Sequence, residues 1–248
     1  MTQKRLVGFT SAHLHMIGMA LMLCDHMWAV GMVKSDFFTI IGRIAYPIFA
    51  FLMVEGFFHT RNVKKYLQRL LVFAIISEIP FNLVAGGGSL FYPLHQNVLW
   101  TFLLGLLMLH FMEKQKTKSF LTRVLMSGFL LVVFLLLALI GMVDYYAPGI
   151  LTIFVFYLFH GNKWYHYLGQ LCGLYYINCE VLGGLVYPVA IGDWHFEFPQ
   201  QGFALLALLS IWLYNGNKGY DKKWFKFACY GFYPLHLLIL GLWGILFA

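Results

Sequence analysis

Charged residues are scarce in this chain. They make up 11% of its 248 residues, whereas 61% of the residues are hydrophobic. Soluble domains carry about 25% charged and about 45–50% apolar residues. A chain that folds in water does not need so much apolar surface, but a chain surrounded by lipid does. The scarcity of charge therefore excludes a soluble globular domain and predicts an integral membrane protein.

Acidic residues are the scarcer of the two charge classes. The chain has 10 Asp and Glu against 17 Lys and Arg, which gives a net charge of +7. A nucleic-acid-binding protein spreads its basic charge over a wet surface. Here the basic residues form short clusters between apolar runs, which is the pattern that sets membrane topology. We therefore expect membrane lipid as a partner and no nucleic acid.

Several motifs with defined chemistry are also missing. The four cysteines form no CxxC pair, and the histidines form no HExxH motif. The glycines at 86–88 are not followed by the GK[ST] of a Walker loop, so they predict a flexible turn. We accordingly expect no metal site and no such nucleotide-binding loop, and we interpret the cysteines as small apolar packing residues.

Long apolar runs are what the chain has in abundance. Most of them fit the roughly 17–25 residues that a spanning helix needs. The seventh is longer and is broken around residues 178–184, so it can be one span or two half-helices. We predict an all-α, polytopic transmembrane helix bundle of nine to ten spans, forming a single domain over residues 1–248. The nine apolar segments are 12–33, 37–59, 67–86, 94–112, 120–143, 147–160, 164–191, 201–214 and 227–247.

The distribution of Lys and Arg predicts the orientation of these spans. The connection after the second segment is strongly basic, and so are those after the fourth and eighth, while the alternate connections are poor in Lys and Arg. Because basic loops stay in the cytoplasm, the N-terminus is predicted inside, in a multi-pass protein of the cell membrane. The basic residues 1–5 precede a long apolar run, which predicts a retained first span rather than a cleaved signal peptide.

Six ionisable residues fall inside the apolar segments. Each charge at the centre of a spanning helix costs about 2.5–3.5 kcal/mol, so these side chains must face the bundle interior and find partners. With a rise of about 1.5 Å per residue, Asp25 on the first span and Arg43 on the second reach the same depth, which predicts a pair. The six residues are Asp25, His26, Arg43, Glu55, Glu78 and His236.

The same depth estimate sorts the polar residues into two layers. Asp25, His26, Arg43, Glu78 and His236 fall in an outer layer, which we call the polar layer, and residues 95–97 open the fourth span slightly above it. Glu55 and His59 are four residues apart, so they share a helix face in a second layer near the basic loop. Paired charges of this kind can also serve only to hold helices in register.

The polar layer contains the groups that an acyl transfer requires. His26 can act as a base at neutral pH, and Arg43, Gln96 and Asn97 can donate to a developing oxyanion. The basic inner loop would attract the phosphates of an acyl-coenzyme A donor. The same parts also suit a proton-coupled secondary transporter, with Asp25, Glu78 and His236 as the proton path. A third reading is an assembly subunit whose charges are structural.

Several stretches resemble the TraX family of membrane acetyltransferases. They are RIAYPIFAFLMVEGFFHT at 43–60, the basic positions to 69, SEIPF at 77–81, QNV at 96–98 and YPLH at 233–236. The pair Asp25-His26 in the first span matches as well, and the resemblance covers essentially the whole chain. One departure is Asn82, which stands where the family pattern leads us to expect Asp.

This resemblance implies an activity. The namesake of the family acetylates the N-terminus of conjugative pilin in the inner membrane, with acetyl-coenzyme A as donor. The family is similar to a wider group of transmembrane acyltransferases that includes heparan-α-glucosaminide N-acetyltransferase. In that relative, a polar residue and a His in an early span carry catalysis ahead of an aromatic run with a proline. The matching elements here are Asp25, His26 and residues 46–51.

The residues and the resemblance together predict an acyl-CoA-dependent transmembrane acyltransferase. It would move an acetyl or similar short acyl group from acetyl-CoA to an amine or hydroxyl acceptor that the family does not identify. His26 is the predicted base or transient acyl carrier, and Asp25 and Arg43 assist it. The predicted acyl or acceptor contacts are His95, Gln96, Asn97, Glu78 and His236. The predicted coenzyme A contacts are Arg61, Lys64, Lys65, Arg69, Glu55 and His59.

Overall fold

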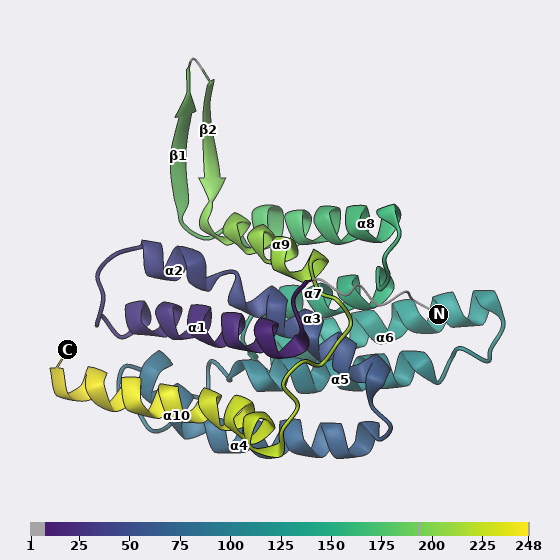
Figure 1. Ribbon diagram of the computed structural model, residues 1–248, viewed down its shortest axis with the longest axis horizontal. Helices are drawn as coiled ribbons and strands as arrows, with labels where there is room; N and C mark the ends of the chain where they lie inside the picture. Colours follow the sequence, from purple (N-terminus) through teal and green to yellow (C-terminus); the bar gives the residue numbers. More distant parts are fainter. Residues whose placement is uncertain (1–7, 193, 248) are drawn as a thin grey trace.

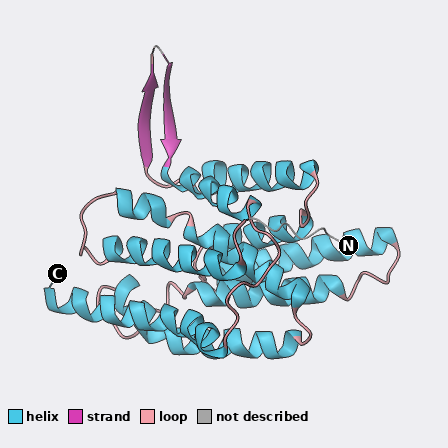
Figure 2. Cartoon of the chain, viewed as in Figure 1, coloured by secondary structure: helices cyan, strands magenta, loops and turns pink. Residues whose placement is uncertain are grey.

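The computed structural model describes residues 8–192 and 194–247, and it is mostly helical (Figures 1 and 2). The predicted basic start, residues 1–5, lies outside the described residues. The elements are α1 Ser11–Ala29, α2 Phe37–Gly42, α3 Ala45–His59, α4 Val63–Ala85, α5 Val98–Glu113, α6 Phe120–Ile140, α7 Tyr146–Leu158, α8 Trp164–Tyr175, π-helix η1 Tyr176–Leu182, β1 Val186–Ile191, β2 Trp194–Pro199, 3-10 helix η2 Gln200–Leu206, α9 Ala207–Trp212 and α10 Lys223–Phe247.

Polar caps set where several helices begin. The Thr10 hydroxyl accepts a hydrogen bond from the His13 backbone N–H, and the His13 ring accepts one from the Thr10 N–H. Asn62 accepts from the Lys65 N–H at 2.9 Å at the start of α4, and Asn97 accepts from the Leu99 N–H at 3.1 Å at the start of α5. Each cap satisfies an N–H group that the first helical turn leaves unpaired.

A proline explains the break between α2 and α3. Pro47 has no backbone N–H, and its ring opposes a helical path through the carbonyl four residues earlier, at Arg43. The chain leaves the first helix at Gly42 and begins the next at Ala45. Arg43 therefore lies at a discontinuity, where its side chain can turn toward α1.

The core centres on α3, most of whose residues are buried. They pack with α5 and α7 into one large apolar cluster. At the edge of the bundle, α10 lies along α4 although the two are far apart in sequence (Figure 1). α6 is mostly exposed and strongly apolar, as expected for a helix that faces lipid.

Four helical stretches among the described residues are long and apolar enough to cross a membrane: Phe37–His59, Val63–Ala85, Phe120–Ile140 and Lys223–Phe247. Val98–Glu113, Tyr146–Leu158 and Gln200–Trp212 are apolar but shorter. α1 has 19 residues but carries three histidines and an aspartate. The predicted nine to ten full-length spans are therefore not supported, because apolar runs in the sequence include turns and flanking residues that the helices leave out.

The prediction of an all-α fold is also wrong in one place. The predicted segment 164–191 does break near Asn178, where α8 passes into the π-helix η1. Its second part is not a half-helix, because Val186–Ile191 is a strand that pairs antiparallel with Trp194–Pro199. The resulting β-hairpin projects from the bundle (Figure 2). Short apolar runs do not distinguish a strand from a helix, which is why the sequence pattern misled.

One end of the bundle gathers most of the basic residues. α1 begins there, beside the segment at 217–218, since the Ser11 N–H donates to the Asn217 carbonyl at 2.9 Å. α3 ends and α4 begins at the same end, and α10 also starts there (Figure 1). We call this the basic end, and its residues include Arg61, Lys64, Lys65, Arg69, Lys218, Lys222, Lys223 and Lys226.

Candidate functional site

An ion pair between α1 and the α2–α3 break forms one part of the polar layer. The Arg43 guanidinium donates to the Asp25 carboxylate, and both side chains are largely covered, at 17% and 18% exposure. Arg43 also donates to the Thr39 hydroxyl at 3.1 Å. A Cβ atom at Gly42 would overlap the Asp25 side chain, so only glycine lets the two helices approach this closely. The pairing predicted from helix depth is confirmed.

A second pair joins α1 to α10. The His26 Nδ1 atom lies 2.7 Å from the His236 Nε2 atom, and the two rings are stacked with centroids 4.9 Å apart. The other nitrogen of His236, Nδ1, lies 2.7 Å from the carbonyl oxygen of Phe232. His236 is buried and follows Pro234 inside α10. Two residues 210 positions apart are thus brought into contact, and both were predicted to lie in the polar layer.

When both rings are neutral, these contacts determine their tautomers. A carbonyl oxygen only accepts, so His236 must carry its proton on Nδ1 and its Nε2 must accept. His26 therefore donates from Nδ1, and its lone pair lies on Nε2. Within the described residues, the hydrogen bond of the His26 ring is made through Nδ1 and not through Nε2. The arrangement holds one imidazole as an available base, oriented by another imidazole rather than by a carboxylate.

Glu78 forms a third group, on α4 facing α5. Its Oε2 atom accepts from the Asn97 amide at 2.5 Å and from the Trp100 indole at 2.9 Å. Its Oε1 atom is buried and has no partner in the described protein. Asn97 is fully buried, and it also donates to the Ala74 carbonyl at 2.9 Å. Glu78 thus organises the start of α5 and does not contact Arg43 in the described structure.

The loop before α7 brings a further acid to this region. His95 Nε2 donates to the Asp144 carboxylate at 3.2 Å. Asp144 lies within electrostatic reach of His26 and Arg43 as well. Tyr145 stacks on Tyr46 with ring centroids 4.0 Å apart. The loop therefore adds an acid to the polar layer, and its Tyr145 packs on Tyr46 of α3.

The backbone of this loop is strained. Met142, Tyr145 and Tyr146 have φ values of 48°, 60° and 42°, which residues with side chains seldom adopt. Gln96 holds the loop in place, because its N–H donates to the Met142 carbonyl at 2.8 Å and its carbonyl accepts from Asp144 at 2.9 Å. The Gln96 amide itself donates to Pro93. Strain that is held by several contacts is a feature of functional sites.

The lower layer contains an unpredicted partner. Glu55 accepts from His160 Nε2 at 2.6 Å and lies 3.5 Å from His59 Nδ1, so the predicted proximity of Glu55 and His59 is confirmed. Arg61, Lys64, Lys65 and Arg69 are exposed at the start of α4 and form no ion pair within the described residues. Glu55 therefore contacts two histidines and forms no ion pair with these four basic residues.

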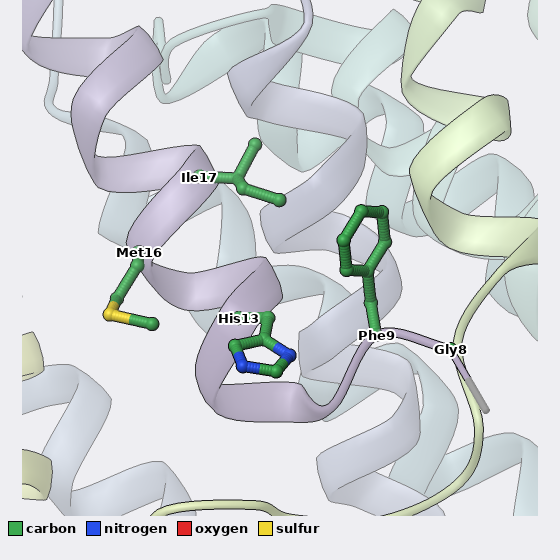
Figure 3. A pocket seen from close by; sticks show the side chains of 5 residues that line it. All are labelled: Gly8, Phe9, His13, Met16 and Ile17. Carbon is green, nitrogen blue, oxygen red and sulfur yellow. The ribbon is translucent and has the colours of Figure 1, made fainter. Parts of the chain in front are cut away.

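A cavity of about 440 Å³ opens beside the first turns of α1. Gly8, Phe9, His13, Met16 and Ile17 line it (Figure 3). Its walls are mostly apolar. The cavity lies toward the basic end, because α1 begins there. Ile17 comes nine residues before His26 on α1, a separation of about 14 Å along the helix.

Comparison with known proteins then decides the family. The sequence pattern of the family described as "TraX protein" matches residues 10–244, which is nearly the whole chain. The chain belongs to the TraX family. Its membership and its long apolar helices make it a membrane protein with transmembrane helices.

This TraX chain is also similar to a protein described as "Probable fimbrial assembly protein FimC, serogroup H1" from Dichelobacter nodosus. The two are 34% identical over 116 residues. The match covers 43% of this chain and 48% of that protein, so it spans about half of the relative's length. No solved structure matches the chain.

Two groups in the TraX fold escaped the sequence interpretation. Asp144 lies in a connection that was judged only by its lack of Lys and Arg, and His160 follows the short α7. The available signal for Asp144 was an acid between a long apolar run and two tyrosines. His160 had no comparable signal, because Glu55 is 105 residues away.

The His95–Asp144 contact predicts a pH dependence of stability. The hydrogen bond to Asp144 raises the pKa of His95 above its ordinary value near 6.5. A raised pKa means that the contact stabilises the fold fully below that ordinary value and is lost as the pH rises through the raised one. We expect Asp144→Asn to lower the melting temperature more at acidic pH than at alkaline pH. Equal losses at all pH values in detergent melting curves would contradict this.

Proposed function

We propose that this TraX protein is a membrane-embedded acyltransferase that uses acetyl-CoA or a similar short acyl-CoA. The observation that carries the proposal is the His26–His236 pair, which leaves a lone pair on Nε2 of His26. Asp25 of the Asp25–Arg43 ion pair is the preceding residue on α1, and Arg43 lies within electrostatic reach of His26. A base held in one tautomer near a guanidinium is suited to deprotonate a nucleophile and to stabilise an oxyanion.

The transfer would proceed as follows. Nε2 of His26 takes the proton from the amine or hydroxyl of the acceptor while that atom attacks the thioester carbonyl. Arg43, held by Asp25, stabilises the negative charge on the tetrahedral oxygen. The carbon–sulfur bond then breaks, and the coenzyme A thiolate leaves with the proton that His26 gives up. In a route through an acyl-histidine, Nε2 of His26 would instead attack the thioester carbonyl, and another base would take the proton of the acceptor.

The donor would enter from the basic end, which we propose to be cytoplasmic together with the N-terminus. His26 lies 15 residues beyond Ser11, so its distance from that end is about 22 Å along α1. Coenzyme A separates its phosphates from its thioester by a long flexible arm, which suits such a spacing. The apolar cavity beside α1 lies along the same route.

The acceptor is the less defined substrate. Because the named relative is described as a fimbrial assembly protein, components of surface fibres are reasonable acceptors to test beside sugars and lipids. The proton path of the alternative transporter has less support, because Asp25, Glu78 and His236 each bond to different partners.

Binding of acetyl-CoA provides the test of this proposal. We expect calorimetry on the purified protein in detergent to detect binding that weakens at high salt, because exposed Lys and Arg would hold the phosphates. Lys65→Ala or Arg69→Ala should weaken it several-fold. Lys34→Ala, at the opposite end of the bundle, is the matched control and should not. No binding between micromolar and millimolar donor would refute the proposed activity.

A further inference from the structure

The β-hairpin has two chemically different faces. Because paired residues of an antiparallel ladder lie on the same face, Tyr187 and Phe198 share one face with Val189 and Trp194. We call this the aromatic face. The opposite face carries Val186, Pro188, Ala190, His195, Glu197 and Pro199. The aromatic side chains therefore lie on one face and His195 and Glu197 on the other, although the strands are only six residues long.

The bundle covers the aromatic face at its base and leaves the outer part open. The hairpin projects away from the helices and runs across their long axes (Figure 1). Its contacts with the bundle lie at the base, where Phe203 meets Phe198 and Tyr187 with ring centroids 5.0 and 6.4 Å apart. Farther out, Trp194 is 79% exposed. Because an isolated two-stranded hairpin is at best marginally stable in water, this face needs a cover.

The hairpin continues a surface that faces lipid. Along α8, Trp164, Leu168, Leu171 and Tyr175 recur every three or four residues and are all exposed, so they form one outward apolar stripe. Leu185, at the base of the hairpin, is a further exposed apolar residue, at 57% exposure. α8 begins beside Lys163 at the basic end, so the hairpin leaves the bundle toward the opposite end. A segment that crosses the helix axes there runs along the plane of the membrane.

We propose that the hairpin lies on the bilayer surface at the end opposite the basic residues. Its aromatic face enters the boundary between headgroups and acyl chains, and its Glu197 face remains in water. Trp and Tyr side chains prefer this boundary because one part of each ring is apolar and another can hydrogen-bond. This attachment of the hairpin to the membrane does not depend on acyl transfer.

Tryptophan fluorescence in phosphatidylcholine vesicles tests this placement. The emission of Trp194 is obtained by subtracting the emission of the Trp194→Phe variant from that of the native protein. We expect lipids brominated near the headgroup to remove most of that difference, while aqueous iodide has little effect. Quenching by iodide alone would place the aromatic face in water and overturn the proposal. Protection from both quenchers would place it against a second copy or another protein, which would overturn the proposal as well.

A matched variant examines the opposite face. Glu197→Trp in the Trp194→Phe background places the indole on the opposite face of the same hairpin. Its emission should be quenched by iodide and only weakly by brominated lipid. Trp164→Phe serves as a positive control for a lipid-facing tryptophan, since Trp164 is 74% exposed on α8. Equal lipid quenching at positions 194 and 197 would contradict the assigned orientation.

Discussion

Replacement of His26 by alanine is expected to abolish most acetyl transfer. A positioned acid–base group contributes about 10²- to 10⁴-fold to a proton-transfer step, and His26 offers an imidazole whose tautomer is set by its neighbour. The measurement is incorporation of label from radioactive acetyl-CoA into membranes that contain the protein, compared with membranes that lack it. His26→Ala should reduce incorporation to near the background, while the amount of folded protein in detergent stays close to the native level.

Two companion variants separate catalysis from packing. His236→Phe keeps an aromatic ring against His26 but removes the acceptor nitrogen, so it should cause a partial loss of transfer. His195→Ala removes an exposed histidine on the β-hairpin, outside the polar layer, and should retain the transfer chemistry. If His26→Ala retained full transfer, His26 would take no part in the reaction, and the His26–His236 pair would serve only to pack α1 against α10.

The sequence predicted the polar layer because helix geometry is regular. A constant rise per residue placed Asp25 and Arg43 at one depth, and the need to neutralise charge in lipid then required them to meet. His26 and His236 were predicted at similar depth, and the structure adds the contact between them. The regular spacing of Glu55 and His59 on α3 also predicted their proximity.

The parts that were missed depend on irregular backbone. Asp144 reaches His95 because the loop at 142–146 adopts left-handed conformations that no hydropathy pattern encodes. His160 meets Glu55 across a loop, where helical periodicity gives no register. The hairpin was interpreted as part of a span because Val186–Ile191 is apolar throughout and a short apolar run does not distinguish a strand from a helix, although Pro188 argues against a helix interior.

Breaking the Asp25–Arg43 pair is expected to have the largest effect on stability. Removal of one partner leaves the other charge in a largely covered site, and such losses cost about 3–5 kcal/mol when burial is complete. Because both side chains retain slight exposure, we expect Arg43→Ala and Asp25→Ala to lie near the lower end of that range. Unfolding in detergent, followed by thermal melting, measures the loss. Lys116→Ala breaks an exposed ion pair of 2.8 Å with Glu113 and is the matched control, with an expected change below about 0.5 kcal/mol.

The double variant Asp25→Asn with Arg43→Gln decides what the pair does. Removal of both charges should restore most of the stability that either single change loses, because no unpaired charge remains. Transfer should still be lost, since the guanidinium that we assign to the oxyanion is gone. Recovery of both stability and transfer would show that transfer does not need the guanidinium, and would refute the role assigned to Arg43. Recovery of stability alone would show that transfer needs the charged pair although the fold does not.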